Sequence, residues 1–179
     1  PPFIETPTET NYTYETVIDG IEIPWGMAFI DENDILVTEK SGTLYRITDG
    51  SKQTVEGLPD IYVRGQGGLL DIALHPDYNT NNIIYMTLAA DTEEDRLGGN
   101  TSLYCAKLVG TKLEEVKLLY KAVPNTKKGQ HFGSRIVFDQ EGHLYFSVGD
   151  RGNRDENPQD ITRDGGKIYR LNLDGSIPA

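Results

Sequence analysis

The residues whose types and spacing could do chemistry are His131 and Asp150, which flank a predicted β-hairpin. The runs 134–138 and 143–148 are rich in β-forming side chains, and a polar turn over 139–142 separates them. Two such runs joined by a short glycine-containing turn indicate a tight antiparallel hairpin. His131 and Asp150 therefore lie at its open end.

The register of this hairpin determines whether the two side chains meet. If Phe138 pairs with His143, the numbers of paired residues add to 281, and His131 is opposite Asp150. Directly opposed residues have Cβ atoms roughly 4.5–5.5 Å apart. The predicted arrangement is a histidine beside a carboxylate, which is typical of a general base and the group that orients it.

The composition of the chain favours a globular protein with one ordinary core. Its 179 residues are 37% hydrophobic and 25% charged, and the apolar runs are too short to span a membrane. Seventeen Lys and Arg against 28 Asp and Glu give a net charge of −11, which opposes binding to nucleic acid or anionic lipid. Neutral or cationic ligands suit this charge better.

Two further features concern the cellular location. Cys105 is the only cysteine, so it is expected to be a packing residue and no internal disulfide can form. The Pro/Thr/Glu-rich residues 1–8 look like a leader that follows a removed export signal or lipid anchor. We therefore expect a periplasmic or extracellular protein. A cytoplasmic protein with an irregular N-terminus is the alternative.

Three β patterns recur in the same order along the chain, and a fourth, more polar pattern follows the first two copies. The first pattern occupies 27–29, 72–74 and 136–138, the second 35–38, 83–88 and 144–148, the third 44–47, 103–106 and 168–171, and the fourth 53–57 and 113–120. Because the first pattern recurs at 27, 72 and 136, the periods are 45 and 64 residues. Four-stranded propeller blades typically take about 40–50 residues, and insertions extend some of them.

The sequence therefore predicts an all-β fold, a β-propeller with about three four-stranded blades. The expected blades are 21–62, 63–122 and 123–179, the last one incomplete. Residues 1–20 would form a leader and an outer strand, at 12–18, that closes the ring on its last blade. Propellers need about 4–8 blades, so the chain is expected to be the N-terminal half of a larger ring. Its open edge would then pair with the missing half or with another copy.

Longer motifs stand at 24–29 (PWGMAF), 65–78 (GQGGLLDIALHPDY), 131–153 and 166–172 (GKIYRLN). Together they resemble the soluble quinoprotein glucose and aldose sugar dehydrogenases, over about residues 23–178. The resemblance implies a six-bladed propeller that holds pyrroloquinoline quinone (PQQ) and calcium at the top of the ring. Such enzymes oxidise the C1 position of aldoses to lactones and pass the electrons to an acceptor that the sequence does not identify.

The resemblance also implies roles for individual residues. His131 matches the general base and Asp150 the carboxylate that orients it, while Gln66 matches a side chain that binds the quinone. Gln130 stands where the glucose enzyme has an aspartate near the sugar, which leaves the preferred sugar open. The family's calcium ligands and quinone-binding cations come later than Ala179, so the metal ligands are unknown and residues 1–179 alone are expected to be inactive.

Simpler roles are expected for several other residues. His75 and His143 are predicted to be structural, as are Arg64, Arg135 and Arg151 unless they are solvated. The loop 150–157 has the oxygen-rich composition of a calcium loop but not its ligand spacing, and an ordinary solvated loop is the preferred interpretation. The glycines at 65–68 either approach a ligand closely or form a turn.

Two functions are consistent with these observations. One is a PQQ-dependent aldose dehydrogenase with His131 as its base. The alternative is a non-enzymatic propeller that binds a partner, since one fold supports many functions. The combination of His131, Asp150 and Gln66 favours the enzyme, because a scaffold does not need these three side chains together.

Overall fold

The computed structural model describes residues 11–91 and 98–179, so the predicted leader at 1–8 lies outside the described residues. The regular structure is almost entirely β, with a single helical turn, α1 (Tyr78–Asn81). The strands are β1 (Pro24–Phe29), β2 (Asp34–Glu39), β3 (Thr43–Thr48), β4 (Ser51–Val55), β5 (Leu69–Leu74), β6 (Ile83–Ala90), β7 (Asn100–Val109), β8 (Lys112–Lys121), β9 (Gly133–Phe138), β10 (His143–Val148) and β11 (Lys167–Asn172).

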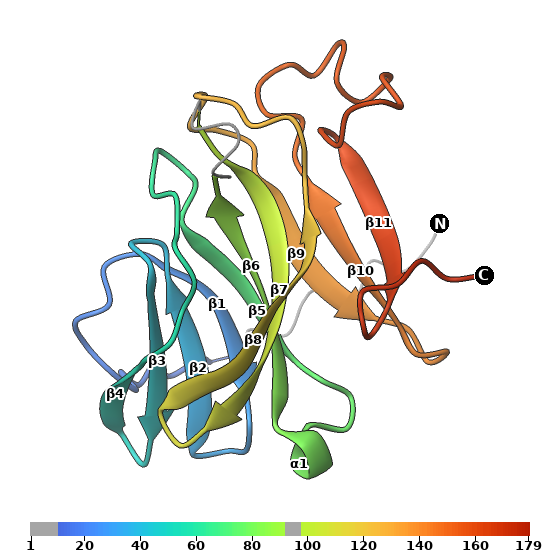
Figure 1. Cartoon of the computed structure of the whole chain (residues 1–179). Coiled ribbons are helices and arrows are strands. Elements are labelled where there is room, and N and C mark those ends of the chain that lie inside the picture. The colour runs from blue at the N-terminus through green and yellow to red at the C-terminus, as the bar shows by residue number, and fades with distance from the viewer. Residues whose placement is uncertain (1–10, 92–97) are drawn as a thin grey trace, which may run out of the picture.

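The strands form three antiparallel sheets in chain order, β1 to β4, β5 to β8 and β9 to β11. The sheets stand side by side like the vanes of a fan, with β1, β5 and β9 in contact along their inner edge (Figure 1). We call them sheets 1, 2 and 3. The prediction of an all-β propeller with about three blades is confirmed, and the described part of sheet 3 has three strands instead of four.

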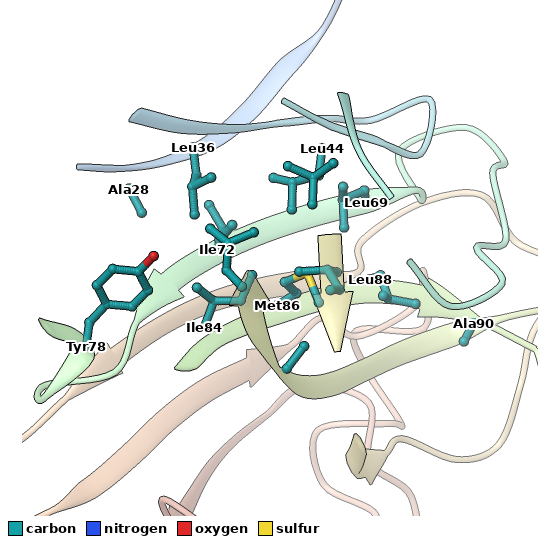
Figure 2. Close-up of a cluster of buried hydrophobic side chains, with 14 residues drawn as sticks. Ala28, Leu36, Leu44, Leu69, Ile72, Tyr78, Ile84, Met86, Leu88 and Ala90 are labelled. Atoms are coloured by element: carbon teal, nitrogen blue, oxygen red, sulfur yellow. The ribbon is translucent and has the colours of Figure 1, made fainter. Parts of the chain in front are cut away.

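The core lies between neighbouring sheets. Ala28, Leu36 and Leu44 of sheet 1 face Ile72 and other buried side chains of sheet 2 (Figure 2). A second cluster joins sheet 2 to sheet 3. It contains Tyr85, Leu103, Ala122, Ile136, Leu144, Phe146, Val148 and Leu171. Sheet 2 is therefore covered on both faces.

Burial along the strands shows that, among the described residues, sheet 2 is covered on both faces and sheet 3 on only one. From Ile84 to Ala90, β6 is buried at every position, because sheet 2 has a neighbour on each side. In β9 the buried residues alternate with exposed ones, and Val137 is 54% exposed. Ile168 on β11 is also exposed. One face of sheet 3 thus remains open among the described residues.

The three inner strands carry the same irregularity at the same place. Each has one extra residue near its beginning, within 24–26 of β1, 69–72 of β5 and 133–136 of β9. Such β-bulges bend a strand and shift its register by one. The irregularity recurs with the repeat, so it is a property of the blade rather than of one loop.

The bulge corrects the predicted register of the third hairpin. Phe138 pairs with Leu144 rather than with His143, so the paired numbers near the turn add to 282. The extra residue in β9 then restores the pairing of Gly133 with Val148, whose numbers add to 281. The prediction was therefore wrong at the turn and right at the open end.

A hydroxyl on the second strand of each sheet bonds to the bulge, and it is buried in Thr38 and Thr87 and half-buried in Ser147. Oγ1 of Thr38 accepts the Gly26 N–H at 2.9 Å and donates to the Leu70 carbonyl of sheet 2 at 2.5 Å. Thr87 repeats the pattern, accepting from the Asp71 N–H at 3.0 Å and donating to the Ser134 carbonyl of sheet 3 at 2.8 Å. Ser147 accepts from the Ser134 N–H at 3.0 Å, in the third copy of this arrangement.

Residues 12–18, predicted as a ring-closing outer strand, adopt no strand in this structure. Val17 and Ile18 instead line an apolar pocket on the free face of sheet 1, together with Met27 and Phe29. Pairing of this segment with a last blade stays a prediction. No helix among the described residues has the length and apolarity that crossing a membrane requires.

Candidate active site

His131 and Asp150 are in contact, as the spacing predicts. His131 precedes β9 and Asp150 follows β10, and Nδ1 of the imidazole lies 2.8 Å from Oδ1 of the carboxylate. An ionised carboxylate only accepts hydrogen bonds, so Nδ1 of the imidazole is the donor in this contact. No hydrogen-bond partner of Nε2 is found among the described residues, and 47% of the imidazole is exposed.

The backbone at this point is unusually tight. His131 has a φ of 55°, which is uncommon for a residue with a side chain. A Cβ atom on Gly149 would lie 2.1 Å from the His131 carbonyl oxygen, so only glycine fits there. The close approach of these two backbones brings the imidazole over the loop that carries Asp150.

The environment of Asp150 keeps its side chain ionised. The hydrogen bond from His131 lowers the pKa of this carboxyl below its ordinary value, and the Gly152 N–H, 2.7 Å from Oδ1, adds to the effect. Asn157 donates to the Asp150 backbone carbonyl at 2.9 Å and fixes the loop. Oδ1 of the carboxylate is thus fixed by two donors, the His131 imidazole and the Gly152 N–H.

Gln66 reaches the site from sheet 2. Its Oε1 accepts the His131 backbone N–H at 2.7 Å, and its own N–H donates to the Gly129 carbonyl at 2.7 Å. A Cβ on Gly65 would lie 2.2 Å from that same carbonyl oxygen. The glycine-containing turn therefore approaches the chain's own backbone, and Gln66 ties the histidine to the neighbouring blade.

Gln130 lies beside the pair, with its side chain packed against Gly152, where a Cβ would be 2.5 Å from its Nε2. An open pocket of about 320 Å³ adjoins these groups. Its lining comes from two loops at the same end of the sheets, at the top of Figure 1. The lining residues are Gln130, His131, Asp150, Gly152, Asn153, Arg154 and Asp155.

The other two histidines have structural contacts. His75 Nδ1 accepts the Asp77 N–H at 2.9 Å, and the ring stacks on Tyr85. His143 lies at the opposite end of the hairpin, with Nδ1 2.9 Å from an Asp139 oxygen. Neither faces the pocket beside His131.

The calcium ligands are predicted to lie outside residues 1–179, and the described acidic side chains around His131 do not group into a metal site. Asp150 is already engaged by His131 and Gly152, and the remaining acidic side chains of the loop do not converge on one point. The described residues contain one cluster of possible metal ligands, Asp139, Glu141 and His143, which lies at the far end of the hairpin. Residues 150–157 instead bond to one another, with Asn153 donating to Glu156 at 2.9 Å.

The sequence did not indicate that two further residues near the site, Arg151 and Asn157, have buried side chains. Arg151 was expected to be solvated or structural, and it is structural: it is only 1% exposed and lies beneath the segment that carries His131. Asn157, also buried, had been placed in an ordinary solvated loop. Nothing in the local pattern of residues 150–157 distinguishes their buried side chains from their exposed ones.

Comparison with known proteins identifies the family of this chain. Residues 21–179 match the glucose/sorbosone dehydrogenase family. The chain is 31% identical over 169 residues to the aldose sugar dehydrogenase YliI of Escherichia coli, covering 92% of this chain and 45% of that protein. It is 28% identical over 196 residues to quinoprotein glucose dehydrogenase B of Acinetobacter calcoaceticus, covering 94% and 41%.

Solved structures give the same relation. The soluble aldose sugar dehydrogenase of Escherichia coli in its apo-form superimposes with a TM-score of 0.85 at 30% identity, over 92% of this chain and 48% of that one. The PQQ-bound aldose sugar dehydrogenase of Streptomyces coelicolor gives 0.74 at 29% identity, over 90% and 48%. The chain thus spans less than half the length of these proteins. From its matched residues and its three propeller sheets, the chain belongs to the glucose/sorbosone dehydrogenase family.

Proposed function

We propose that this chain supplies the proton-accepting side of a PQQ-dependent dehydrogenase that oxidises an aldose at C1 to the lactone. The observation that carries the proposal is the His131–Asp150 pair, whose free Nε2 is exposed beside a polar pocket. Family membership supports the reaction class, and a solved relative is the PQQ-bound form of an aldose sugar dehydrogenase.

The pocket suits a polyhydroxylated substrate. Its lining is rich in amide, carboxylate and guanidinium groups, which can bond vicinal hydroxyls as both donors and acceptors. Gln130 and Asn153 offer both kinds of group within one side chain. A neutral sugar also agrees with the acidic net charge of the chain, −11.

The role of this chain is proton transfer. When bound, the quinone supplies the acceptor for the hydride that leaves C1. Nε2 of His131 takes the proton of the C1 hydroxyl, so that the C1–O bond gains carbonyl character. The Asp150 carboxylate stabilises the imidazolium that forms and keeps the ring in its productive tautomer.

The cofactor would be held only in part by these residues. Gln66 bonds the His131 backbone N–H, and Arg154 is the only Lys or Arg among the described residues that line the pocket. A quinone with several carboxylates needs further cations. We therefore propose that the other cationic side chains that bind the quinone, and the calcium ligands, belong to a part of the protein outside residues 1–179. The isolated chain should serve as an inactive control.

The test is turnover of aldoses by the full-length enzyme loaded with PQQ and calcium, followed by dye reduction. His131→Ala should lower turnover by about 10²- to 10⁴-fold, the usual contribution of a general base, while quinone binding persists. His143→Ala is the matched control and should leave turnover within about twofold. Unchanged turnover in His131→Ala would show the base to be misassigned. A wild-type enzyme that neither binds PQQ nor oxidises any aldose would instead favour the binding scaffold.

A further inference from the structure

Arg151 directly follows Asp150 in the sequence, yet its side chain points into the protein. It is 1% exposed and is among the largest fully buried side chains of the described residues. Its guanidinium carbon lies 3.4 Å from the centre of the Phe132 ring, in a stacked cation–π contact. Arg151 and Asp150 therefore lie on opposite sides of one stretch of backbone.

The guanidinium bonds to backbone rather than to acids. It donates to the Lys128 carbonyl at 2.7 Å and to the Gln130 carbonyl by a short bond. It also donates to the Gly99 carbonyl at 3.3 Å and to Thr126 Oγ1 at 3.2 Å. No carboxylate of the described residues forms an ion pair with it. Four oxygens of two neighbouring segments thus surround one cation.

Burying a cation without a counter-ion is costly, and here burial lowers the pKa of Arg151 to about 10. The side chain still carries its charge at neutral pH. Methionine or leucine would fill such a space without this cost. What an apolar residue cannot do is hold several carbonyl oxygens in a fixed arrangement.

These carbonyls belong to the segment that carries the candidate base. Residues 127–131 form no regular strand, so their backbone depends on other groups for its geometry. The Arg151 guanidinium bonds Lys128 and Gln130, while Gln66 bonds the next N–H, that of His131. The Arg151 N–H also donates to the His131 carbonyl at 3.3 Å. Gly129 accepts a hydrogen bond from the Gln66 N–H. Every residue from 128 to 131 therefore has a backbone hydrogen bond to Gln66 or to Arg151.

We propose that Arg151 is a positioning residue, which sets the His131 imidazole against Asp150 by holding the carbonyls of Lys128 and Gln130. The geometric part of this inference needs only the structure, and its catalytic consequence rests on the proposed function. Arg151 touches neither Nε2 of His131 nor any reacting atom. It acts through the backbone.

The chain provides its own reference for a test. His131 and His143 each place Nδ1 beside an aspartate oxygen, at 2.8 and 2.9 Å, so each is expected to give a downfield Nδ1–H resonance in proton NMR. In Arg151→Met, the His131 resonance should broaden or disappear, while the His143 resonance stays sharp. Exchange of the His131 backbone amide should accelerate at least tenfold. Arg154→Met, at a side chain 82% exposed in the same loop, should leave both resonances unchanged.

A folded Arg151→Met chain with an unchanged His131 resonance would overturn the proposal. If both resonances vanish because the variant does not fold, Arg151→Lys decides. Lysine keeps the charge but cannot reach four oxygens in a planar fork, so the His131 resonance should broaden relative to that of His143. An unchanged spectrum in that variant would equally reject the proposal. These NMR measurements need no turnover, so they test the role of Arg151 independently of the activity test with His131→Ala.

Discussion

The hairpin of β9 and β10 carries a histidine–aspartate pair at each end, and the two pairs have different surroundings. At the open end, His131 meets Asp150 at 2.8 Å, and at the turn His143 meets Asp139 at 2.9 Å. His131 is 47% exposed, whereas His143 is 14% exposed and its Nε2 lies 3.3 Å from an Arg170 nitrogen. Similar contacts thus leave one imidazole available and the other enclosed.

The carboxylates differ as well. Asp139 also accepts the backbone N–H groups of Glu141 and His143 and the hydroxyl of Tyr145. Desolvation raises the pKa of Asp139, but the bonds from the backbone and imidazole of His143 and from the Glu141 N–H outweigh it and bring the pKa down to about 2. The turn pair is therefore part of the loop closure. His131 lines the pocket beside Asp150, whereas His143 does not, and this difference separates the candidate catalytic pair from the structural one.

The largest effect expected from this comparison is on turnover. Asp150→Asn in the full-length enzyme should lower kcat by about 10- to 100-fold, less than His131→Ala, because the imidazole stays in place but loses the charge that stabilises its protonated form. Asp139→Asn should change kcat by less than about twofold. Equal losses in both variants would mean that the two pairs are not functionally distinct.

For stability, the pair at the turn should matter more than the pair at the open end. His143→Ala removes a side chain that is mostly buried and bonded to Asp139, so the free energy of unfolding should fall by about 1–2 kcal/mol. His131→Ala should cost only about 0.5 kcal/mol, since its side chain is half exposed. Urea denaturation of both variants measures this. A larger loss in His131→Ala would assign the open-end pair a structural role.

The smallest effect concerns the bulge that separates the two registers. Ser134 has a φ of 106°, which favours glycine, and its buried hydroxyl has no hydrogen-bond partner among the described residues. Ser134→Gly should therefore leave the free energy of unfolding unchanged or raise it by up to about 1 kcal/mol. It should also preserve the His131 Nδ1–H resonance. A clear loss of stability would show that the side chain helps to set the register.

Much of the fold could be predicted from the sequence, because the repeated apolar patterns have the period of strands and the spacing of blades. The three sheets follow that pattern in order. The meeting of His131 with Asp150 was also predicted, although the pairing at Phe138 was one residue out. Two shifts cancelled there, since the turn places five residues between Phe138 and Leu144, one more than predicted, and the extra residue in β9 shifts the register back. A pattern of alternating residues contains no signal for the bulge.

The supporting residues were harder to predict for a physical reason. Arg151 and Asn157 lie in a polar loop, and only the packing of that loop against residues 126–132 buries them. The resemblance implied that Gln66 binds the quinone, and the structure adds a bond to the His131 backbone that joins residues far apart in the sequence. Local composition does not report contacts of that range.

The hydroxyls of Thr38 and Thr87 give the row of sheets a direction. Each donates forward, from an earlier sheet to the bulge carbonyl of the next one along the chain. During synthesis, a finished sheet would already present the donor that its successor needs, so sheets can be added in the order in which they are made. Ser147 occupies the same place on sheet 3. The third copy of this hydroxyl thus belongs to the hairpin that carries the candidate base.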